Sequence, residues 1–339
     1  MFTLDRRYFL FIGVVLIVFG VLLLGWTPAG ITAEKPILLR YAGTMPVGHV
    51  ITRGMEKWAS LVEKECGGRI KIEQYPAGQL YKTDDFPRAI PSGEIELAQI
   101  VADTVGGLVK TTEVMNFGMV FNSWEQAIKT MYEGWDIFQA DFQKSNMHLL
   151  FLMPYGMTVM PMTRNKQIKT LEDMKGLMIR GMAGRPGRAL ELCGATPVYI
   201  SSREVFTAMQ LGTIDGAMSG WSTYFRRGWH EVGKYIIDIP YSFTVFMTAA
   251  NLDAWRKLPK DIQEIMVKTG REVAESMLED AKKDDKVCRE KLIQAGVKIH
   301  TPPPEEIARW KERVLPMWNE WAAEDPKHAQ LLKLATKER

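Results

Sequence analysis

Residues 174–221 read MKGLMIRGMAGRPGRALELCGATPVYISSREVFTAMQLGTIDGAMSGW, and this stretch decides the fold class. Short apolar runs alternate along it with segments of helical character: predicted strands at 177–180, 195–200 and 213–218, and predicted helices at 188–193 and 202–212. Strands that alternate with helices in this way indicate an α/β fold whose strands run parallel.

Arg180 closes the first of these runs and precedes a loop that carries Gly181, Gly184 and Gly187. Ligands of open α/β sheets bind at the carboxyl ends of strands, and glycines let a ligand approach the backbone. A guanidinium holds a carboxylate through two parallel, charge-assisted hydrogen bonds. The pattern therefore predicts that Arg180 binds an anion, and an internal salt bridge is the alternative that the residues leave open.

The composition bounds the class of protein. The chain has 339 residues and is 46% hydrophobic, which is enough for two domains with their own cores. Its formal charge is +3, and the basic residues are interspersed with acids throughout. A nucleic-acid-binding protein needs a basic patch or stripe, so the sequence excludes nucleic acid as a partner.

Residues 1–33 have the features of a targeting segment. Arg6 and Arg7 precede an apolar run at 8–26, and small residues follow it. This is the order of a secretory signal peptide, so we expect export of the protein. The run is at the lower length limit for spanning a bilayer, which leaves an uncleaved N-terminal anchor as the alternative.

Motifs for catalysis or metal binding do not stand out. The three cysteines, Cys66, Cys193 and Cys288, lie far apart without a CxxC pair, and they are expected to be buried apolar residues. The five histidines show no ligand spacing, so we expect neither metal nor cofactor. The glycines after Arg180 have GxxGxxG spacing rather than GxGxxG, so a dinucleotide-dependent oxidoreductase is only the second hypothesis.

The rest of the chain continues the α/β pattern. Its predicted strands lie at 37–43, 70–76, 95–101, 148–163, 243–251 and 297–302, and its predicted helices at 50–65, 85–92, 124–143, 259–295 and from 304 onward. The last residues, from Asp325, are charged and are expected to fray.

Three motifs resemble a known family. MKGLMIR (174–180), GATPVYISSREVFTAMQLGTIDG (194–216) and TAANLDAWRKLP (248–259) are similar to the DctP-type substrate-binding proteins of tripartite ATP-independent periplasmic (TRAP) transporters. The resemblance implies a two-lobed, periplasmic-binding-protein-like fold with hinge strands that cross between the lobes and a long spanning helix. It implies a non-enzymatic periplasmic receptor that delivers a small organic acid to membrane-embedded permease subunits. In that family the arginine matching Arg180 grips the substrate carboxylate.

The resemblance also places the lobes. Lobe I is expected at 36–156 plus about 247–285, and lobe II at 157–246 plus about 286–325, with a charged tail at 326–339. The chain is expected to cross between them near 157–163 and again within 243–251. A membrane-anchored ligand-sensing module of the same fold, with residues 1–33 retained, remains an alternative.

Two departures from the family pattern, and one likeness to some of its members, bear on the ligand. Met160 occupies the position of a second carboxylate-binding arginine in many relatives, and Ser219 that of an asparagine, while Trp221 resembles members with an aromatic wall there. These changes imply a monocarboxylate with an apolar or aromatic body. Four further residues are expected to face the cleft, with core packing or a solvated loop position as the alternative: Tyr155, Phe243, His49 and Asp84.

Overall fold

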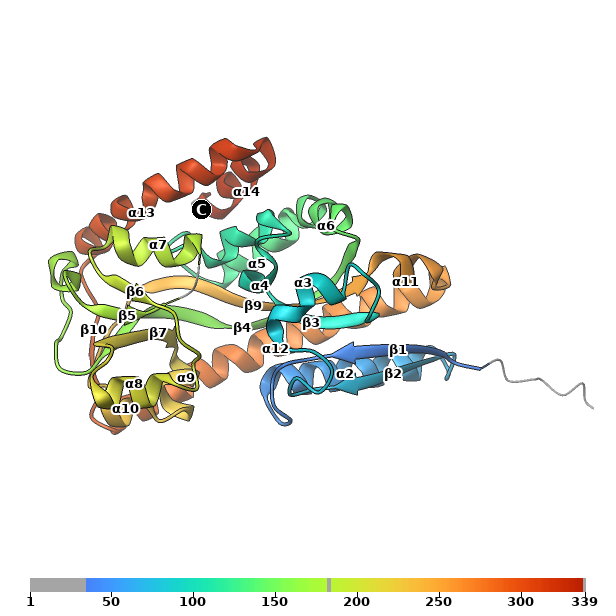
Figure 1. The fold of residues 1–339 in the computed structure, drawn as a ribbon, viewed down its shortest axis with the longest axis horizontal. Helices are drawn as coiled ribbons and strands as arrows, with labels where there is room; N and C mark the ends of the chain where they lie inside the picture. The colour runs from blue at the N-terminus through green and yellow to red at the C-terminus, as the bar shows by residue number, and fades with distance from the viewer. Residues whose placement is uncertain (1–34, 182–183, 338–339) are drawn as a thin grey trace, which may run out of the picture. The chain divides into compact units, whose positions relative to one another are not determined.

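A mixed β-sheet with helices on both faces forms the framework of residues 37–339 (Figure 1). The computed structural model describes residues 35–181 and 184–337. Met1–Pro36 and Ile37–Arg339 are separate units, and the predicted targeting segment at 1–33 lies outside the described residues. Of the helices described, none has the length and apolar character needed to cross a membrane.

Ten strands of the described chain pair in the order β2-β1-β3-β9-β4-β7-β5-β6, with β8 paired to β4 and β10 paired to β8. Their bounds are β1 Ile37–Ala42, β2 Ile70–Tyr75, β3 Leu97–Val101, β4 Met147–Thr163, β5 Met178–Arg180, β6 Thr196–Val198, β7 Gly216–Gly220, β8 Tyr235–Ile237, β9 Pro240–Asn251 and β10 Lys298–His300.

The helices follow the same chain order. They are α2 Val50–Glu65, α3 Phe86–Ala89, α4 Ala102–Val105, α5 Trp124–Glu133, α6 Trp135–Lys144, α7 Arg185–Leu192, α8 Val205–Leu211, α9 Trp221–Arg226, α10 Trp229–Val232, α11 Leu252–Lys257, α12 Lys260–Gln294, α13 Pro304–Glu324 and α14 Pro326–Thr336. Three 3₁₀ turns lie between them: η1 Thr83–Asp85, η2 Lys110–Asn116 and η3 Leu171–Met174.

The sheet is parallel toward its ends and antiparallel in its middle. Strand β1 runs parallel to β2 and β3, and β5 runs parallel to β6 and β7. Strand β9, however, is antiparallel to both β3 and β4. The prediction of a parallel sheet is therefore wrong for its centre. Strands β4 and β9 are long and buried at most positions, and such a pattern indicates burial on both faces but not strand direction.

Strand β4 connects the two parallel regions. From Met147 to Val159 it pairs with β9, and from Thr158 to Thr163 it pairs with β7. Register shifts interrupt the β4–β9 ladder between Pro154 and Gly156. The two predicted segments at 148–156 and 157–163 thus form one strand that crosses from one region of the sheet to the other.

Helix α12 spans the sheet, as the resemblance implies. Figure 1 shows it running along β4, and it packs in turn against α2, β4 and α9. Its buried side chains recur at helical spacing on one stripe, which includes Ile262, Met266, Val273 and Met277.

Two helical predictions differ from the structure. The segment 124–143 forms two helices rather than one, with Gly134 between α5 and α6, where a Cβ would come within 2.5 Å of Leu331. The expected frayed tail forms helix α14, because Leu331 and Ala335 recur four residues apart and are buried. Asp325 begins α14 by accepting a hydrogen bond from the Lys327 N–H.

Candidate ligand-binding cavity

A cavity of about 270 Å³ lies where the ends of β3, β5 and β7 meet the crossing strands β4 and β9. The described residues that line it are Met45, His49, Val101, Asp103, Asn116, Tyr155, Gly156, Thr158, Arg180, Ser202, Met218, Ser219, Gly220, Ser222, Thr223, Arg227, Thr244, Phe246 and Asp285. They come from segments far apart in sequence, which only the folded sheet brings together.

Arg180 is held in place by backbone carbonyls. It ends β5, its Nε donates to the Ile200 carbonyl at 3.2 Å, and an Nη donates to the Met218 carbonyl at 3.2 Å. These bonds use two of the five N–H donors of a guanidinium. Among the described residues no carboxylate lies within ion-pair distance of it. The internal salt bridge left open by the sequence is therefore not seen in the described chain.

Asp103 faces the same cavity from the other side of the crossing strands. It follows β3 at the start of α4, and its side chain is open to the cavity although protein surrounds it on most sides. This enclosure raises the pKa of its carboxyl, and the charge of Arg180 opposes that rise from a distance. The cavity thus contains a cation and an acid that are not paired with each other.

Two further polar side chains in the cavity each have one atom without a protein partner in the described chain. Asn116, at the end of η2, is 2% exposed, and its Nδ2 donates to no atom of the described chain. Asp285, in the middle of α12, is 8% exposed, and its Oδ2 accepts no hydrogen bond there. Burial, with help from the charge of Asp284, raises the pKa of Asp285 to about 7. A buried polar group without a partner is costly, so these atoms are candidates for contact with a bound molecule or water.

Apolar side chains form part of the remaining wall, together with the hydroxyl side chains of Thr158, Ser202, Ser219, Ser222, Thr223 and Thr244. Met45, Val101, Met218 and Phe246 line it, and Tyr155 packs edge-on against Phe246 with ring centroids 5.8 Å apart. The Tyr155 hydroxyl lies 3.2 Å from the Thr223 hydroxyl. An apolar wall with a few convergent polar groups is the usual form of a small-molecule site.

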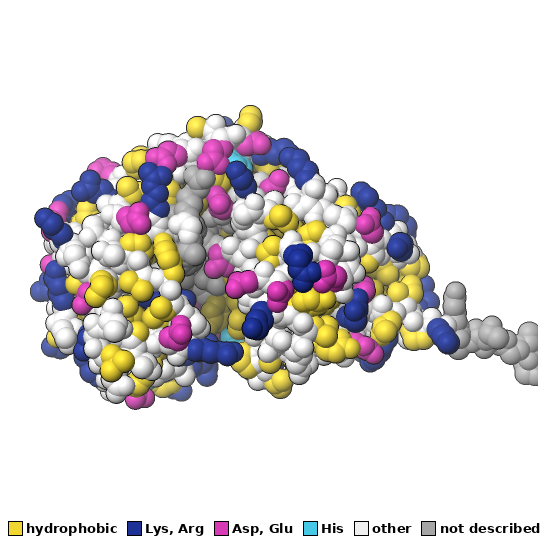
Figure 2. Space-filling model, in the orientation of Figure 1, with side chains coloured by type: hydrophobic (Ala, Val, Ile, Leu, Met, Phe, Trp, Pro, Cys, Tyr) yellow, Lys and Arg dark blue, Asp and Glu magenta, His cyan; other side chains and the backbone are white. Residues whose placement is uncertain are grey.

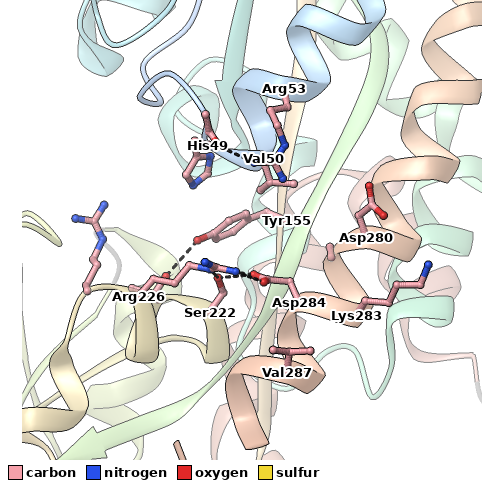
Figure 3. A pocket seen from close by; sticks show the side chains of 14 residues that line it. His49, Val50, Arg53, Tyr155, Ser222, Arg226, Asp280, Lys283, Asp284 and Val287 are labelled. Carbon is pink, nitrogen blue, oxygen red and sulfur yellow. Dashed lines mark hydrogen bonds and ion pairs between the residues drawn. The ribbon is translucent and has the colours of Figure 1, made fainter. Parts of the chain in front are cut away.

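The cavity adjoins an outer basin of about 740 Å³, drawn in Figure 3. His49 lies between the two, stacked on Tyr155 with centroids 5.5 Å apart, and its Nδ1 caps α2 by accepting from the Ile51 N–H at 3.3 Å. Burial, with the nearby Arg227 and Arg53, lowers the pKa of His49 to about 4, so this ring is neutral at pH 7.

Across the basin, Arg226 of α9 pairs with Asp284 of α12, which also accepts a hydrogen bond from the Ser222 hydroxyl at 2.7 Å. Arg227 is exposed and lines both the basin and the cavity. Over the face drawn in Figure 2, basic and acidic side chains are interspersed.

Four of the predicted site residues lie at the cavity: Arg180, Tyr155, His49 and Ser219. The other four lie elsewhere. Met160 and Phe243 are fully buried in the hydrophobic core, where Phe243 packs edge-on against Trp124, and neither is among the described lining residues. Trp221 is buried in a different cluster beneath the Arg289 guanidinium, 5.2 Å from its ring centroid. Asp84 is exposed on η1.

The sequence prediction missed Asp103, Asn116 and Asp285. Asp103 follows the apolar run at 95–101, so the rule that singled out Arg180, a polar residue at a strand's carboxyl end, would have found it. Asn116 lies in an irregular segment and Asp285 inside a long polar helix, and neither carries a local signal.

Comparisons with known proteins identify the family of the chain. A family model described as bacterial extracellular solute-binding protein, family 7 (DctP) matches residues 41–325. A solute-binding protein of Albidiferax ferrireducens is 28% identical over 299 residues, which cover 86% of this chain and 88% of that protein. The C4-dicarboxylate-binding periplasmic protein DctP of Rhodobacter capsulatus is 24% identical over 292 residues, which cover 85% and 87%.

Solved structures share the fold. A TRAP periplasmic solute-binding protein of Ochrobactrum anthropi superposes with a TM-score of 0.83 at 22% identity, covering 89% of this chain and 95% of that one. One of Rhodoferax ferrireducens, with bound malonate, gives 0.78 at 26% identity, covering 88% and 96%. The two-lobed α/β fold predicted from the sequence is confirmed. The chain therefore belongs to the bacterial extracellular solute-binding proteins of family 7, the DctP-type receptors of TRAP transporters.

Proposed function

We propose that this protein is an exported receptor that captures a small organic acid in the cavity at Arg180 and delivers it to a TRAP permease. The family consists of transport receptors, which gives no support to the oxidoreductase hypothesis. Relatives such as the protein of Rhodobacter capsulatus are periplasmic, and residues 1–33 would direct this chain to the same compartment.

The observation that carries the proposal is the state of Arg180. Its guanidinium is fixed by two carbonyls inside a cavity, with no described carboxylate to neutralise it. A carboxylate of the ligand would supply the missing charge. Hydrogen bonds to charged groups contribute about 1.5–3 kcal/mol each, so this contact is large enough to decide affinity and orientation.

The proposed ligand is a monocarboxylate with a partly apolar body. Within the described lining, Arg180 is half-buried and Arg227 is exposed, and Met45, Val101, Met218 and Phe246 form the apolar part of the wall. Family structures hold several carboxylates: malonate in Rhodoferax ferrireducens, pyroglutamic acid in Bordetella pertussis and orotic acid in Desulfovibrio salexigens. A cavity of about 270 Å³ suits acids of this small size.

Capture would involve closure of two lobes. The proposed lobe I is 36–156 plus about 247–285, and lobe II is 157–246 plus about 286–325. Strands β4 and β9 and helix α12 would form the hinge, since they pass between the two regions. A ligand that contacts both lobes favours the closed form in proportion to its extra contacts there.

The test is Arg180→Ala, with Arg180→Lys as the conservative variant and Arg256→Ala, exposed on α11, as the matched control. Ligand co-purified with the wild type is identified by mass spectrometry, removed and added back, together with malonate, pyroglutamate and orotate. At about 100 times its Kd a ligand stabilises the folded state by about 2.7 kcal/mol, which a thermal melt detects.

We expect the wild type and Arg256→Ala to be stabilised by at least one acid. Arg180→Ala should lose this stabilisation while its circular dichroism stays unchanged, and Arg180→Lys should retain a weakened response, since an ammonium cannot bind a carboxylate through a planar fork. Unchanged affinity in Arg180→Ala would refute the proposed function.

A further inference from the structure

We propose, building on the function just described, that the bound acid carries an N–H or O–H group that donates a hydrogen bond to Asp103. Asp103 lies across the cavity from Arg180, which holds the carboxylate of the ligand. The ligand class is then narrower than a plain organic acid. It consists of small monocarboxylates with an amine, amide or hydroxyl group on the body.

The positions of the two charged residues support this assignment. Asp103 follows β3 and Arg180 ends β5, and three strands of the sheet separate β3 from β5. Both side chains line one cavity, yet they form no ion pair with each other. A molecule between them can therefore touch both at once.

The environment of Asp103 makes a donor necessary. Enclosure by protein penalises its charged form, and the charge of Arg180 offsets only part of that penalty. The Asp103 side chain is open to the cavity, so a purely apolar ligand would displace water from this carboxyl without replacing the lost hydrogen bonds, which is costly. An N–H or O–H group on the ligand restores the hydrogen bond.

Asn116 supports the same conclusion independently. Its side chain is 2% exposed, lines the cavity, and has an Nδ2 without a partner in the described chain. It offers a donor to an acceptor atom of the ligand, such as the carbonyl of an amide. The cavity therefore provides the guanidinium of Arg180, the carboxyl of Asp103 and the amide of Asn116. Together these groups fit an acid whose body carries both a hydrogen-bond donor and an acceptor.

The acidic groups also disfavour dicarboxylates. Arg227, the second cation of the described lining, is exposed where the cavity adjoins the basin, so a second carboxylate that points inward from Arg180 would face Asp103 or the buried Asp285. Like charges at close range in a site of low dielectric repel, so a second negative charge is selected against.

The experiment uses two matched pairs of acids with the full exported chain. Pyroglutamate is compared with cyclopentanecarboxylate, which has the same ring size without the N–H, and lactate is compared with propionate, which lacks the hydroxyl. Affinities are measured by titration calorimetry for the wild type, Asp103→Ala and Asp103→Asn. Asp136→Asn, an exposed acid of α6 outside the cavity, is the control for the charge change.

We expect the donor-bearing member of at least one pair to bind the wild type at least roughly tenfold more tightly than its partner, as one hydrogen bond to a charged group allows. In Asp103→Ala this ratio should fall toward one, mainly through weaker binding of the donor-bearing acid. Asp103→Asn should lower the ratio while its circular dichroism stays unchanged, and Asp136→Asn should keep the wild-type ratio.

Equal affinities within both pairs, or a ratio that survives in both Asp103 variants, would overturn this inference and leave the role of Arg180 intact. Failure of all four acids to bind the wild type would also count against it. Failure of the proposed function has a different signature, since binding of the co-purified ligand would then be independent of Arg180.

Discussion

At the scale of single residues, the buried carboxyl of Asp285 makes stability depend on pH. It is 8% exposed in the middle of α12, beside Asp284, and the backbone N–H groups of Met157 and Ser222 only partly favour its charged form. Burial therefore dominates, and it raises the pKa to about 7 from an ordinary value near 3.8. An acid whose pKa is higher in the folded state stabilises the fold below its unfolded pKa.

This shift makes stability depend on pH. Between about pH 4 and pH 7 the folded chain holds a proton that the unfolded chain has lost, so the contribution of Asp285 falls as pH rises through about 7. Asp285→Asn removes the penalty. We expect the variant to match the wild type near pH 4 and to exceed its stability at pH 8 by up to about 4 kcal/mol, at about 1.4 kcal/mol per pKa unit.

Urea unfolding at pH 4, 6 and 8 measures the effect as a difference between the two proteins. His49 and His148 both have a pKa lowered to about 4 and contribute the opposite slope, but they are present in both chains and cancel. Asp280→Asn, exposed on the same helix, is the control. A difference that does not change with pH would contradict the burial argument.

Site residues were predictable where a local pattern carried them. Arg180 and Tyr155 follow or belong to apolar runs that ended where expected, and both lie at the cavity. Trp221 was expected to form a wall by likeness to relatives, but its ring packs under Arg289 in the core. The place of Asp285 at the cavity could not be predicted from the sequence. It is one of many acidic residues in a polar helix of 35 residues, and only the packing of that helix shows that its side chain is buried.

At the scale of secondary-structure elements, the contact between α12 and β4 limits what can change. Gly270 lies at the point of closest approach, where a Cβ would be 2.8 Å from the Cβ, Cγ and Cδ1 atoms of Phe151. These atoms belong to the root of a buried side chain and cannot swing aside. The glycine therefore sets the distance between helix and strand.

Gly270→Ala tests this contact. Alanine is better than glycine in a helix by about 1 kcal/mol, whereas overpacking a core costs about 1–3 kcal/mol. With backbone-proximal atoms in the way, the overpacking term should win, and we expect a net loss of about 1–2 kcal/mol in urea unfolding. Gly107→Ala, where no atom lies within 4 Å of the added Cβ, should be neutral by comparison. Stabilisation of Gly270→Ala would show that the two elements can separate.

Most elements were predictable because their periodicity is strong. The helix expected at 50–65 is α2 with the same bounds, and α12 lies within one residue of the expected 259–295 at each end. The errors concern features that depend on partners. Gly134, which packs against Leu331, divides one amphipathic segment into α5 and α6. Helix α14 is ordered because its apolar side chains pack against residues far away in the sequence.

At the scale of the whole molecule, the three cysteines report on the access of solvent to the interior. Cys66, Cys193 and Cys288 are all free and buried in the core. Burial raises the pKa of each thiol, that of Cys193 to about 12. A neutral, enclosed thiol reacts slowly, because the thiolate is the nucleophile.

We expect a thiol reagent such as DTNB to label the native protein slowly and to count three thiols in urea. The midpoint of thermal unfolding should be the same with and without reductant, since no described disulfide restrains the unfolded chain. Fewer than three thiols in urea without reductant, or a reductant-dependent melt, would contradict this description.

Fold class could be predicted at this scale, and strand direction could not. The α/β alternation and the family motifs implied the two-lobed fold, which the related structures confirm. The antiparallel centre was not predicted because β4 and β9 are buried on both faces. The sequence of such a strand does not show whether it pairs in parallel or antiparallel orientation. Only the register of β9 between β3 and β4 distinguishes them.

That insertion of β9 has a consequence for biogenesis. Residues 240–251 emerge from the ribosome long after β3 and β4, yet they fill the gap between those two strands. Until then β3 and β4 each have an unpaired edge in the nascent chain, and the sheet cannot form at its centre. Unpaired strand edges promote aggregation with other chains. The centre of the sheet can therefore form only after residues 240–251 have been synthesised.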